Sequence, residues 1–312
     1  MRALTVADIA QPRRRIRWGN HLVGYAFLAP WLIGFLVFVA GPMLASAALA
    51  FTDYNVITPP RFVGLANFEK LTEDPRFYIS LYNTAYYTFL GVPAQLAVAM
   101  VLALLLNSRL RFTSFFRSAY YIPTITPVIA SIYLWVWMFN FDYGLINALL
   151  RMVGISPVNW LWDPSVAKIT IIIFSLTRVG AQMIIFLAAL QGVPEELYES
   201  ASIDGATAPQ QFWSITLPMI SPLLFLNLIL GIISSFQVFT VAYIATKGGP
   251  VDSTLFYVLY LYHHGFQNFK MGFASSMAWI LFAVIVIFTL VQFRISRSWV
   301  YYESGTGSGT PR

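Results

Sequence analysis

The chain contains no cysteine and very few charged residues, and each shortage excludes a class of protein. Without cysteine there can be no disulfide, no thiolate metal ligand and no thiol nucleophile. Charged residues make up 10% of the 312 residues, hydrophobic residues make up 58%, and the mean hydropathy is +0.68. A soluble domain normally carries about a quarter charged residues. The composition therefore indicates an integral membrane protein.

Sequence motifs of catalysis are also missing. None of the four lysines follows a glycine, which excludes the phosphate-binding loop of an ATPase. The histidines, His21, His263 and His264, lack the spacing of a zinc-protease motif, and no G-x-S-x-G nucleophile elbow occurs. The sequence favours neither an enzyme nor a metal site, and interfacial hydrogen bonding is the simpler role for the histidines.

Six stretches are long and apolar enough to cross a bilayer core of about 30 Å as helices. They cover residues 22–44, 81–106, 119–139, 166–190, 217–244 and 271–293. Two shorter amphipathic segments, 144–154 and 253–266, predict interfacial helices on the outer face. A secretory signal cleaved near Ala45–Ala47 is the alternative for the first stretch, but the apolar run is too long for one. We predict an all-α membrane protein with six transmembrane helices.

Basic residues near the span ends predict the orientation, because they accumulate on the cytoplasmic side. Three segments on one predicted side carry Arg2, Arg13, Arg14, Arg15, Arg17, Arg109, Arg111, Arg117, Arg294 and Arg297. The loops on the opposite side also contain basic residues, but acidic residues in the same loops reduce their net positive charge. Scattered bases are weak support for nucleic-acid binding. We expect a cytoplasmic basic tail at 1–21, a transmembrane domain at 22–293 and a disordered cytoplasmic tail at 294–312.

The loop 192–216 is also predicted to be cytoplasmic, yet its charge is of the opposite sign. It contains no Lys or Arg and four acids, Glu195, Glu196, Glu199 and Asp204. The loop can be an ordered connection with solvated acids. A slender acidic segment on a basic side also suits a basic groove on a soluble partner, because the charges would steer docking.

Local signals in this loop predict a helix, a tight turn and a second helix. Pro194 suits the first turn of a helix, and the acids that follow favour the positive end of the helix dipole. Gly205 can close that helix in the left-handed conformation. Thr207 and Gln210 then match a capping box, with which a second helix begins.

The residues from Glu199 to Pro222 closely resemble a known signature, E-A-A-x-x-x-D-G-A…F-x-x-I-x-L-P-x-x-x-P. It belongs to permease subunits of binding-protein-dependent importers of the ATP-binding-cassette (ABC) class, and Ser200 replaces its middle alanine. Further segments, "FLAPWLIGFLVFVAGPM", "FVGLANFEKL", "NTAYYTFL", "TKGGP" and "MGFASSMAWILF", look like the carbohydrate-uptake branch, of the maltose and glycerol-3-phosphate permease type. The resemblance extends from about Val23 to Phe293.

The resemblance implies a type I importer permease fold in the cell membrane, with a cytoplasmic coupling-helix loop. It implies a second, similar permease, two ATPase subunits that bind ATP and Mg, an extracytoplasmic solute-binding protein and a sugar substrate. This chain itself would bind no cofactor or metal and hydrolyse no ATP. The residues expected to couple ATPase closure to the membrane helices are Glu195, Glu196, Glu199, Ser200, Ala201, Asp204, Gly205, Ala206 and Phe212.

Polar side chains within the spans are candidates for a sugar path. They are Asn227, Ser234, Gln237, Tyr243, Tyr133 and Arg178. Arg178 is the one charge well inside a span, where it could face a cavity or pair with a backbone carbonyl or a partner. Each polar residue can instead join helices. Neutral sugars fit the sequence better than charged ones, since only Arg178 could match a charge, although glycerol phosphate stays open.

The leading prediction is the permease half of an ATP-driven sugar importer. The alternative is a self-sufficient, ion-coupled secondary transporter. That mechanism calls for acids inside the membrane, whereas every Asp and Glu lies outside the six predicted spans. A membrane scaffold that only docks a soluble protein is a third possibility.

Overall fold

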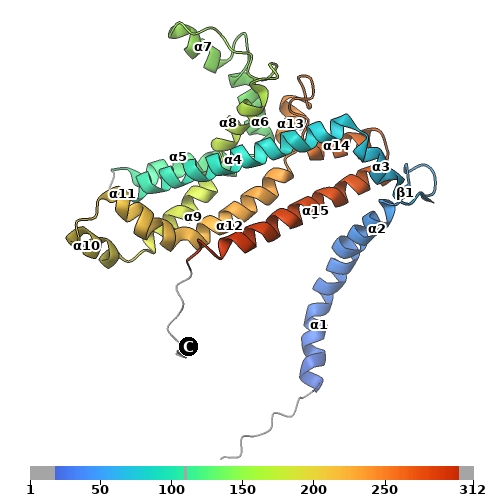
Figure 1. The fold of residues 1–312 in the computed structure, drawn as a ribbon, viewed down its shortest axis with the longest axis horizontal. Helices are drawn as coiled ribbons and strands as arrows, with labels where there is room; N and C mark the ends of the chain where they lie inside the picture. The colour runs from blue at the N-terminus through green and yellow to red at the C-terminus, as the bar shows by residue number, and fades with distance from the viewer. Residues whose placement is uncertain (1–17, 109–110, 302–312) are drawn as a thin grey trace, which may run out of the picture. The chain divides into compact units, whose positions relative to one another are not determined.

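Helices make up almost all of the structure, a computed structural model that describes residues 18–108 and 111–301. Within these residues there is one small sheet, in which β1 (Thr52–Asp53) pairs antiparallel with β2 (Arg61–Phe62). The chain divides into two compact units, residues 1–48 and residues 49–312 (Figure 1). The predicted tails at 1–21 and 294–312 lie largely outside the described residues.

The first unit contains one long helical segment. α1 (Trp18–Phe35), the π-helical turn η1 (Leu36–Ala40) and α2 (Gly41–Leu49) follow one another without a gap. The wider π turn precedes Pro42, whose ring would crowd the carbonyl four residues earlier in a regular α-helix. Residues Tyr25–Leu49 form a candidate span, and none of its most apolar window is buried within the chain. A helix that is apolar all round suits lipid or another protein surface.

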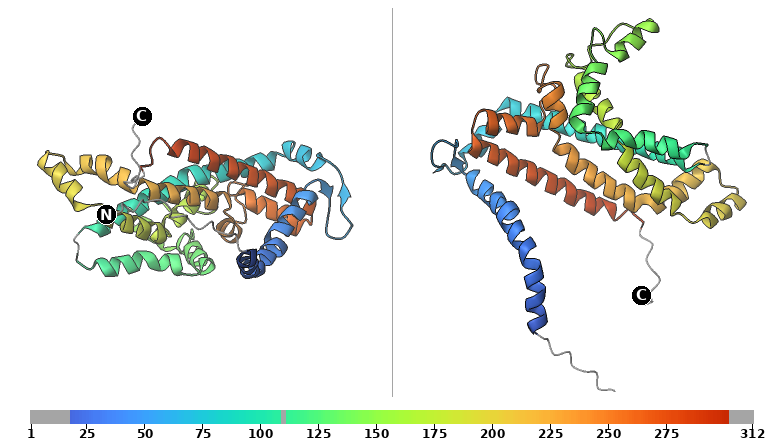
Figure 2. Two further views of the ribbon diagram at one scale, coloured as in Figure 1. Left: turned by 90° about the horizontal axis from the view of Figure 1, so that it is seen from below. Right: turned by 180° about the vertical axis from the view of Figure 1, so that it is seen from behind.

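The second unit is organised around three long helices. They are α4 (Pro75–Asn107), α12 (Leu217–Phe236) and α15 (Met271–Ser296). Figures 1 and 2 show them running alongside one another. The Phe288 ring of α15 lies 5.4 Å from that of Phe89 in α4 and 5.3 Å from that of Phe236 in α12. Ser235 of α12 also donates a hydrogen bond to Thr88 of α4, with an Oγ–Oγ1 distance of 3.0 Å. Apolar packing thus holds the three helices together, and a buried hydroxyl pair adds to the contact between α4 and α12.

Two further helix pairs are bent. They are α5 (Thr113–Ile125) with α6 (Val128–Met138), and α8 (Ala167–Leu176) with α9 (Gly180–Gln191). The first pair bends by 100° and the second by 47°. Thr126 is extended, with ψ of 137°, as is usual before a proline, so the helix ends ahead of Pro127. The second break, at residues 177–179, contains Arg178.

Within the described residues, four helical segments are long and apolar enough to cross a membrane, or up to six if each bent pair is one span. The four confirm helices at the predicted spans 22–44, 81–106, 217–244 and 271–293. The predicted spans 119–139 and 166–190 fall on the bent pairs, so neither is a continuous helix. A hydropathy profile detects an apolar segment, but it does not detect a break in the helix within that segment.

Shorter elements lie at the two ends of the long helices. At one end, α10 (Glu195–Ile203), α11 (Ala208–Gln211) and the π turn η2 (Phe212–Thr216) lead into α12 (Figure 2). At the other end lie α3 (Ala66–Thr72), α14 (Tyr257–Tyr262) and the π turn η3 (His263–Gln267). The other described helices are α7 (Leu145–Met152) and α13 (Thr240–Ala245).

The segment around α14 differs from the surface helix expected for residues 253–266. Tyr257 and Leu259 are fully buried. The Tyr257 N–H donates to Thr84 Oγ1 of α4 at 2.8 Å, and the Tyr257 hydroxyl donates to the Met277 carbonyl of α15 at 2.8 Å. Some of the aromatic residues that suggested an interface, Tyr257 among them, are therefore buried against two long helices, whereas Phe266 stays exposed.

Candidate functional site

The acidic loop begins with the helix that the sequence predicts. α10 follows Pro194, which takes the N-cap position, and it ends before Gly205, whose φ is +81°. The Ala206 N–H donates to the Ala201 carbonyl at 2.9 Å, and the Gly205 N–H donates to the Ser202 carbonyl at 3.1 Å. This pair of bonds is a Schellman motif, for which glycine is the favoured residue. The left-handed turn at Gly205 is confirmed.

The second helix of the loop, α11, is joined firmly to the first. The Thr207 N–H donates to Gln210 Oε1 at 2.7 Å, so the predicted capping box is present. Gln211 Nε2 donates to Ser202 Oγ at 2.9 Å, which ties α11 to α10. The Tyr198 and Thr216 hydroxyls lie 2.9 Å apart and connect α10 to the start of α12. The loop is thus a preformed helix–turn–helix.

The surface of this loop is acidic and open to solvent. Of the predicted coupling residues, Ala201, Ala206 and Phe212 are half-buried, and the exposed ones are Glu195, Glu196, Glu199, Ser200, Asp204 and Gly205. Across the described part of the chain, no side chain hydrogen-bonds to or forms an ion pair with any of the four carboxylates. Their charges are therefore available to another molecule.

Two large apolar residues of the loop, missed by the sequence reasoning, lie among these acids. The Ile203 side chain is 87% exposed and Trp213 is 67% exposed. Apolar anchors surrounded by polar groups are typical of protein–protein contacts. A signal was available, since Ile203 is the last residue of a helix whose other residues are mostly polar or small.

The loop and the carboxyl-terminal end of α15 lie at the same end of the second unit (Figure 1). The Tyr301 N–H donates to Ser221 Oγ at 2.9 Å, and the Trp299 ring lies 5.9 Å from that of Phe225. Both contacts join the chain after α15 to the first half of α12. Arg294 and Arg297 at this end are exposed.

A second candidate site is a cavity of about 560 Å³ in the second unit. Residues of α4, α8, α9 and α12 line it, together with the break that contains Arg178. Of the predicted sugar-path residues, Asn227, Ser234, Gln237 and Arg178 are in the lining, whereas Tyr133 and Tyr243 are not. Tyr133 is 62% exposed, and Tyr243 stacks on Phe239 with ring centroids 5.2 Å apart.

The cavity lining also contains polar residues that the sequence reasoning missed. They are Tyr87, Gln95, Ser175, Gln182 and Thr240. Gln95 Nε2 of α4 donates to Ser175 Oγ of α8 at 3.1 Å. Gln182 follows Arg178 by four residues, which was a usable signal, whereas Gln95 joins the site only through packing between spans. Amides and hydroxyls of this kind can bind the hydroxyl groups of a polar solute.

Arg178 both faces the cavity and bonds to backbone carbonyls, two of the alternatives that the sequence left open. It lies in the cavity lining, and its guanidinium donates to backbone carbonyls at the end of α5. The shortest of these bonds runs from Nη1 to the Pro123 carbonyl at 2.7 Å, and Nη1 also donates to Ser131 Oγ at 3.1 Å. Nη2 donates to the Thr124 carbonyl at 3.3 Å. A cation at a helix carboxyl terminus is favourable, so Arg178 stabilises the bend between α5 and α6.

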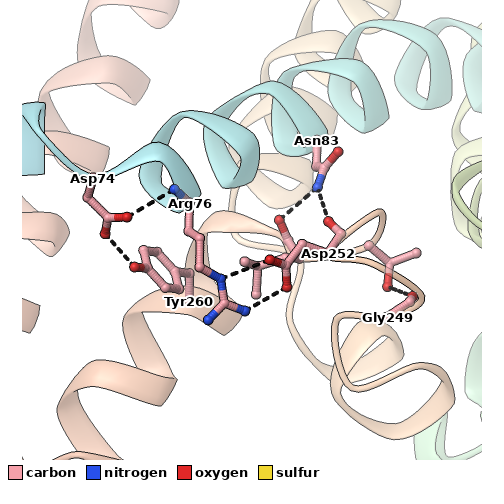
Figure 3. A network of polar contacts seen from close by, with 8 residues as sticks. Asp74, Arg76, Asn83, Gly249, Asp252 and Tyr260 are labelled. Atoms are coloured by element: carbon pink, nitrogen blue, oxygen red, sulfur yellow. Dashed lines mark hydrogen bonds and ion pairs between the residues drawn. The ribbon is translucent and has the colours of Figure 1, made fainter. Parts of the chain in front are cut away.

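The opposite end of the long helices contains a network of paired charges (Figure 3). Arg76 forms a two-pronged ion pair with Asp252, with Nε–Oδ2 and Nη2–Oδ1 distances of 2.8 and 2.6 Å. The Tyr260 hydroxyl donates to the Asp74 carboxylate. Asn83 Nδ2 donates to the Asp252 carbonyl at 2.8 Å. Burial of the Tyr260 side chain raises the pKa of its hydroxyl, and the hydrogen bond to Asp74 raises it further.

This network holds a turn with unfavourable backbone angles. Val251 and Asp252 have φ of 48° and 56°, a left-handed conformation that is costly for a β-branched residue. The Thr254 hydroxyl donates to the Gly249 carbonyl at 2.7 Å within the same turn. Bonds from Arg76 and Asn83 of α4 to Asp252 therefore fix a loop that the local sequence alone would leave strained.

Metal ligands do not gather in the structure. Among the described residues, no group of three or more His, Asp or Glu side chains could hold a metal ion. The lining of the cavity likewise contains no Asp or Glu within that part of the chain.

Comparisons with known proteins show what the chain resembles. Residues 95–300 match the family described as binding-protein-dependent transport system inner membrane component. The chain is 43% identical over 303 residues to the probable ABC transporter permease protein YesP of Bacillus subtilis, covering 96% of this chain and 97% of that protein. It is 33% identical over 285 residues to the trehalose/maltose transport system permease protein MalF of Thermococcus litoralis, covering 91% and 96%.

The fold also matches that of a chain in a solved ABC transporter. A crystal structure of a bacterial ABC transporter involved in import of the acidic polysaccharide alginate aligns with a TM-score of 0.80 at 24% identity, covering 90% of this chain and 96% of that one. Sequence and fold thus agree over nearly the whole chain. The chain belongs to the family of inner membrane permease components of binding-protein-dependent ABC transport systems.

Proposed function

We propose that the chain forms half of the translocation pathway of an ATP-driven sugar importer in the cell membrane. The observation that carries this proposal is the exposed, acidic helix–turn–helix at 192–216 in a permease of this family. The proposed substrate class is supported by relatives such as the trehalose/maltose permease and by the amide- and hydroxyl-lined cavity.

In this proposal each bent helix pair counts as one span, so that the domain at 22–293 crosses the membrane six times. Both tails and the loop 192–216 then lie in the cytoplasm. The loop and the chain after α15 lie at the same end of the second unit, which supports this arrangement. The basic residues Arg294 and Arg297 at that end fit the excess of bases on the cytoplasmic side.

The loop acts as the coupling element. Glu195, Glu196, Glu199 and Asp204 would face basic residues of an ATPase subunit, while Ile203 and Trp213 supply apolar contact area. The slim face at Ser200, Ala201 and Ala206 allows close approach, and Gly205 sets the angle between the two helices. Phe212 begins the segment that leads into α12, so a push on α10 is transmitted to a membrane helix.

The remaining work falls to other subunits. The chain has no phosphate-binding loop, so two ATPase subunits would bind ATP and Mg. A second, similar permease would complete the pathway, and a solute-binding protein would deliver the sugar from outside. The ATPases need only bias an equilibrium between inward-open and outward-open states, through contacts that differ between the two.

An ion-coupled secondary transporter is not supported. Such a protein needs intramembrane carboxylates to bind protons or cations. No Asp or Glu lines the cavity in the described part of the chain. The family and the relatives are ABC transport components throughout.

The test of this function is reconstitution of the complete importer in proteoliposomes. We expect ATP hydrolysis that rises when sugar-loaded binding protein is added, with accumulation of sugar inside. This chain reconstituted alone should accumulate nothing. Accumulation by the chain alone under an ion gradient, without ATPase subunits, would overturn the proposal.

A further inference from the structure

The cavity has an unbalanced charge. Arg178 is the one charged side chain in its lining, among the residues that the structure describes, and no carboxylate accompanies it. The remaining polar lining consists of neutral amides and hydroxyls. A charge inside a membrane span is costly and is usually compensated by a partner of opposite sign. The surroundings of Arg178 therefore indicate what that partner is.

The hydrogen bonds of Arg178 hold its position without neutralising it. Its two Nη groups donate to neutral oxygens, the carbonyls of Pro123, Thr124 and Thr126 and the hydroxyl of Ser131. Within the described residues Arg178 forms no ion pair, and Nε forms no hydrogen bond. The helix end offers only a fraction of a negative charge. Most of the positive charge of the guanidinium thus remains for a ligand in the cavity.

A second group in the lining also lacks a partner. Gln182 Oε1 is buried and accepts no hydrogen bond in the described structure. Leaving such a buried acceptor unpaired is unfavourable. Gln182 follows Arg178 by four residues, near the start of α9, and both line the same cavity. A bound hydroxyl could donate to it.

We propose that the substrate is a sugar with a negatively charged group, a carboxylate or a phosphate, which pairs with Arg178 in the cavity. Gln182 Oε1 accepts a hydrogen bond from a hydroxyl of the same sugar. A cavity of about 560 Å³ has room for a small sugar. This inference rests on the proposed function. The sequence by itself favoured a neutral sugar, and the placement of Arg178 in a cavity without acids reverses that preference.

The first experiment identifies the charge of the transported sugar. The complete importer in proteoliposomes with internal ATP is offered galacturonate oligomers, their methyl esters, maltose and glucose 6-phosphate, and the contents are measured by mass spectrometry. We expect at least tenfold more accumulation of a uronate or of the sugar phosphate than of the neutral sugars, and the accumulated species identifies the anionic group. Accumulation of neutral sugars alone contradicts the inference and leaves the proposed function standing. Accumulation of none of the probes counts against both the inference and the proposed function.

The second experiment assigns the selectivity to Arg178. We expect Arg178→Gln to lower uptake of the anionic sugar by about tenfold or more, whereas Arg178→Lys, which keeps the charge, retains the larger part. Lys168→Gln is the matched control, because Lys168 bonds to Asn83 at 3.0 Å outside the cavity lining. If Arg178→Gln and Arg178→Lys each lower uptake of anionic and neutral sugars equally, Arg178 only supports the helix bend and the inference is wrong.

Discussion

The two ends of the long helices differ in how their acids are used. At the end with α3 and α14, Asp74 and Asp252 are bonded to Tyr260 and Arg76, and the network fixes a strained turn. At the end with α10, the four carboxylates have no partner within the described chain. Acids of the first kind stabilise the fold, whereas acids of the second kind are free to bind another protein. The sequence does not reveal which carboxylates are paired. The absence of a partner does not by itself mark a docking site, because the exposed Glu69 of α3 has no side-chain partner among the described residues either.

The largest effect is expected at the turn between α10 and α11. Gly205→Val places a β-branched residue at φ of +81°, a conformation that costs about 1–2 kcal/mol, and it should change the angle of the loop. We expect sugar uptake to fall by about tenfold or more while the protein still inserts into the membrane. Uptake into proteoliposomes and ATP hydrolysis would be measured together, because uncoupling lowers uptake more than hydrolysis.

Gly154→Val is the matched control for that variant. Gly154 has φ of +77° with nothing within 4 Å of an added Cβ, as at Gly205, and it lies after α7, away from the loop. This control should keep most of the uptake. If both variants lose uptake to the same degree, backbone strain anywhere in the chain explains the loss and the loop has no special role.

A smaller effect is expected from reversing one free charge of the loop. Glu199→Lys should weaken binding of the ATPase subunit by about fivefold at low salt, because one attractive charge is replaced by a repulsive one. The difference should shrink as salt screens the charges. Binding would be measured by titration of purified ATPase subunit, with Glu69→Lys, an exposed acid of α3, as the control. Equal affinities for wild type and Glu199→Lys would remove the electrostatic part of the account.

The smallest effect is expected for the paired acids at the other end. Asp252→Asn removes the ion pair with Arg76. The Arg76 side chain is 52% exposed and the Asp252 side chain is 30% exposed. Such an exposed pair is worth about 1 kcal/mol or less. We expect a melting temperature lower by a few degrees in detergent and unchanged affinity for the ATPase. A loss of ATPase binding in this variant would show that the two ends do not have separate roles.

The parts of the structure that sequence predicted correctly depend on neighbouring residues. The left-handed turn at Gly205 and the capping box of Thr207 and Gln210 are set by contacts within five residues. The four long apolar helical segments follow from uninterrupted apolar runs. Local signals of this kind need no knowledge of the rest of the fold.

The parts that sequence could not predict depend on distant residues. Arg178 bonds to Pro123, 55 residues earlier, and Arg76 pairs with Asp252, 176 residues later. The bend before Pro127 was available as a proline in an apolar run, but its angle of 100° depends on packing. The buried position of Tyr257 likewise depends on α4 and α15, because a tyrosine-rich segment suits an interface or a core equally well.

The orientation of the two ends can be measured directly, because the chain has no cysteine to interfere with labelling. Ile203→Cys and Val251→Cys introduce single thiols at side chains that are 87% and 89% exposed, one in each end region. A membrane-impermeant maleimide added to intact cells should label Val251→Cys and leave Ile203→Cys unlabelled. In inside-out vesicles Ile203→Cys should react, and bound ATPase should protect it. Labelling of Ile203→Cys from outside intact cells would contradict the account.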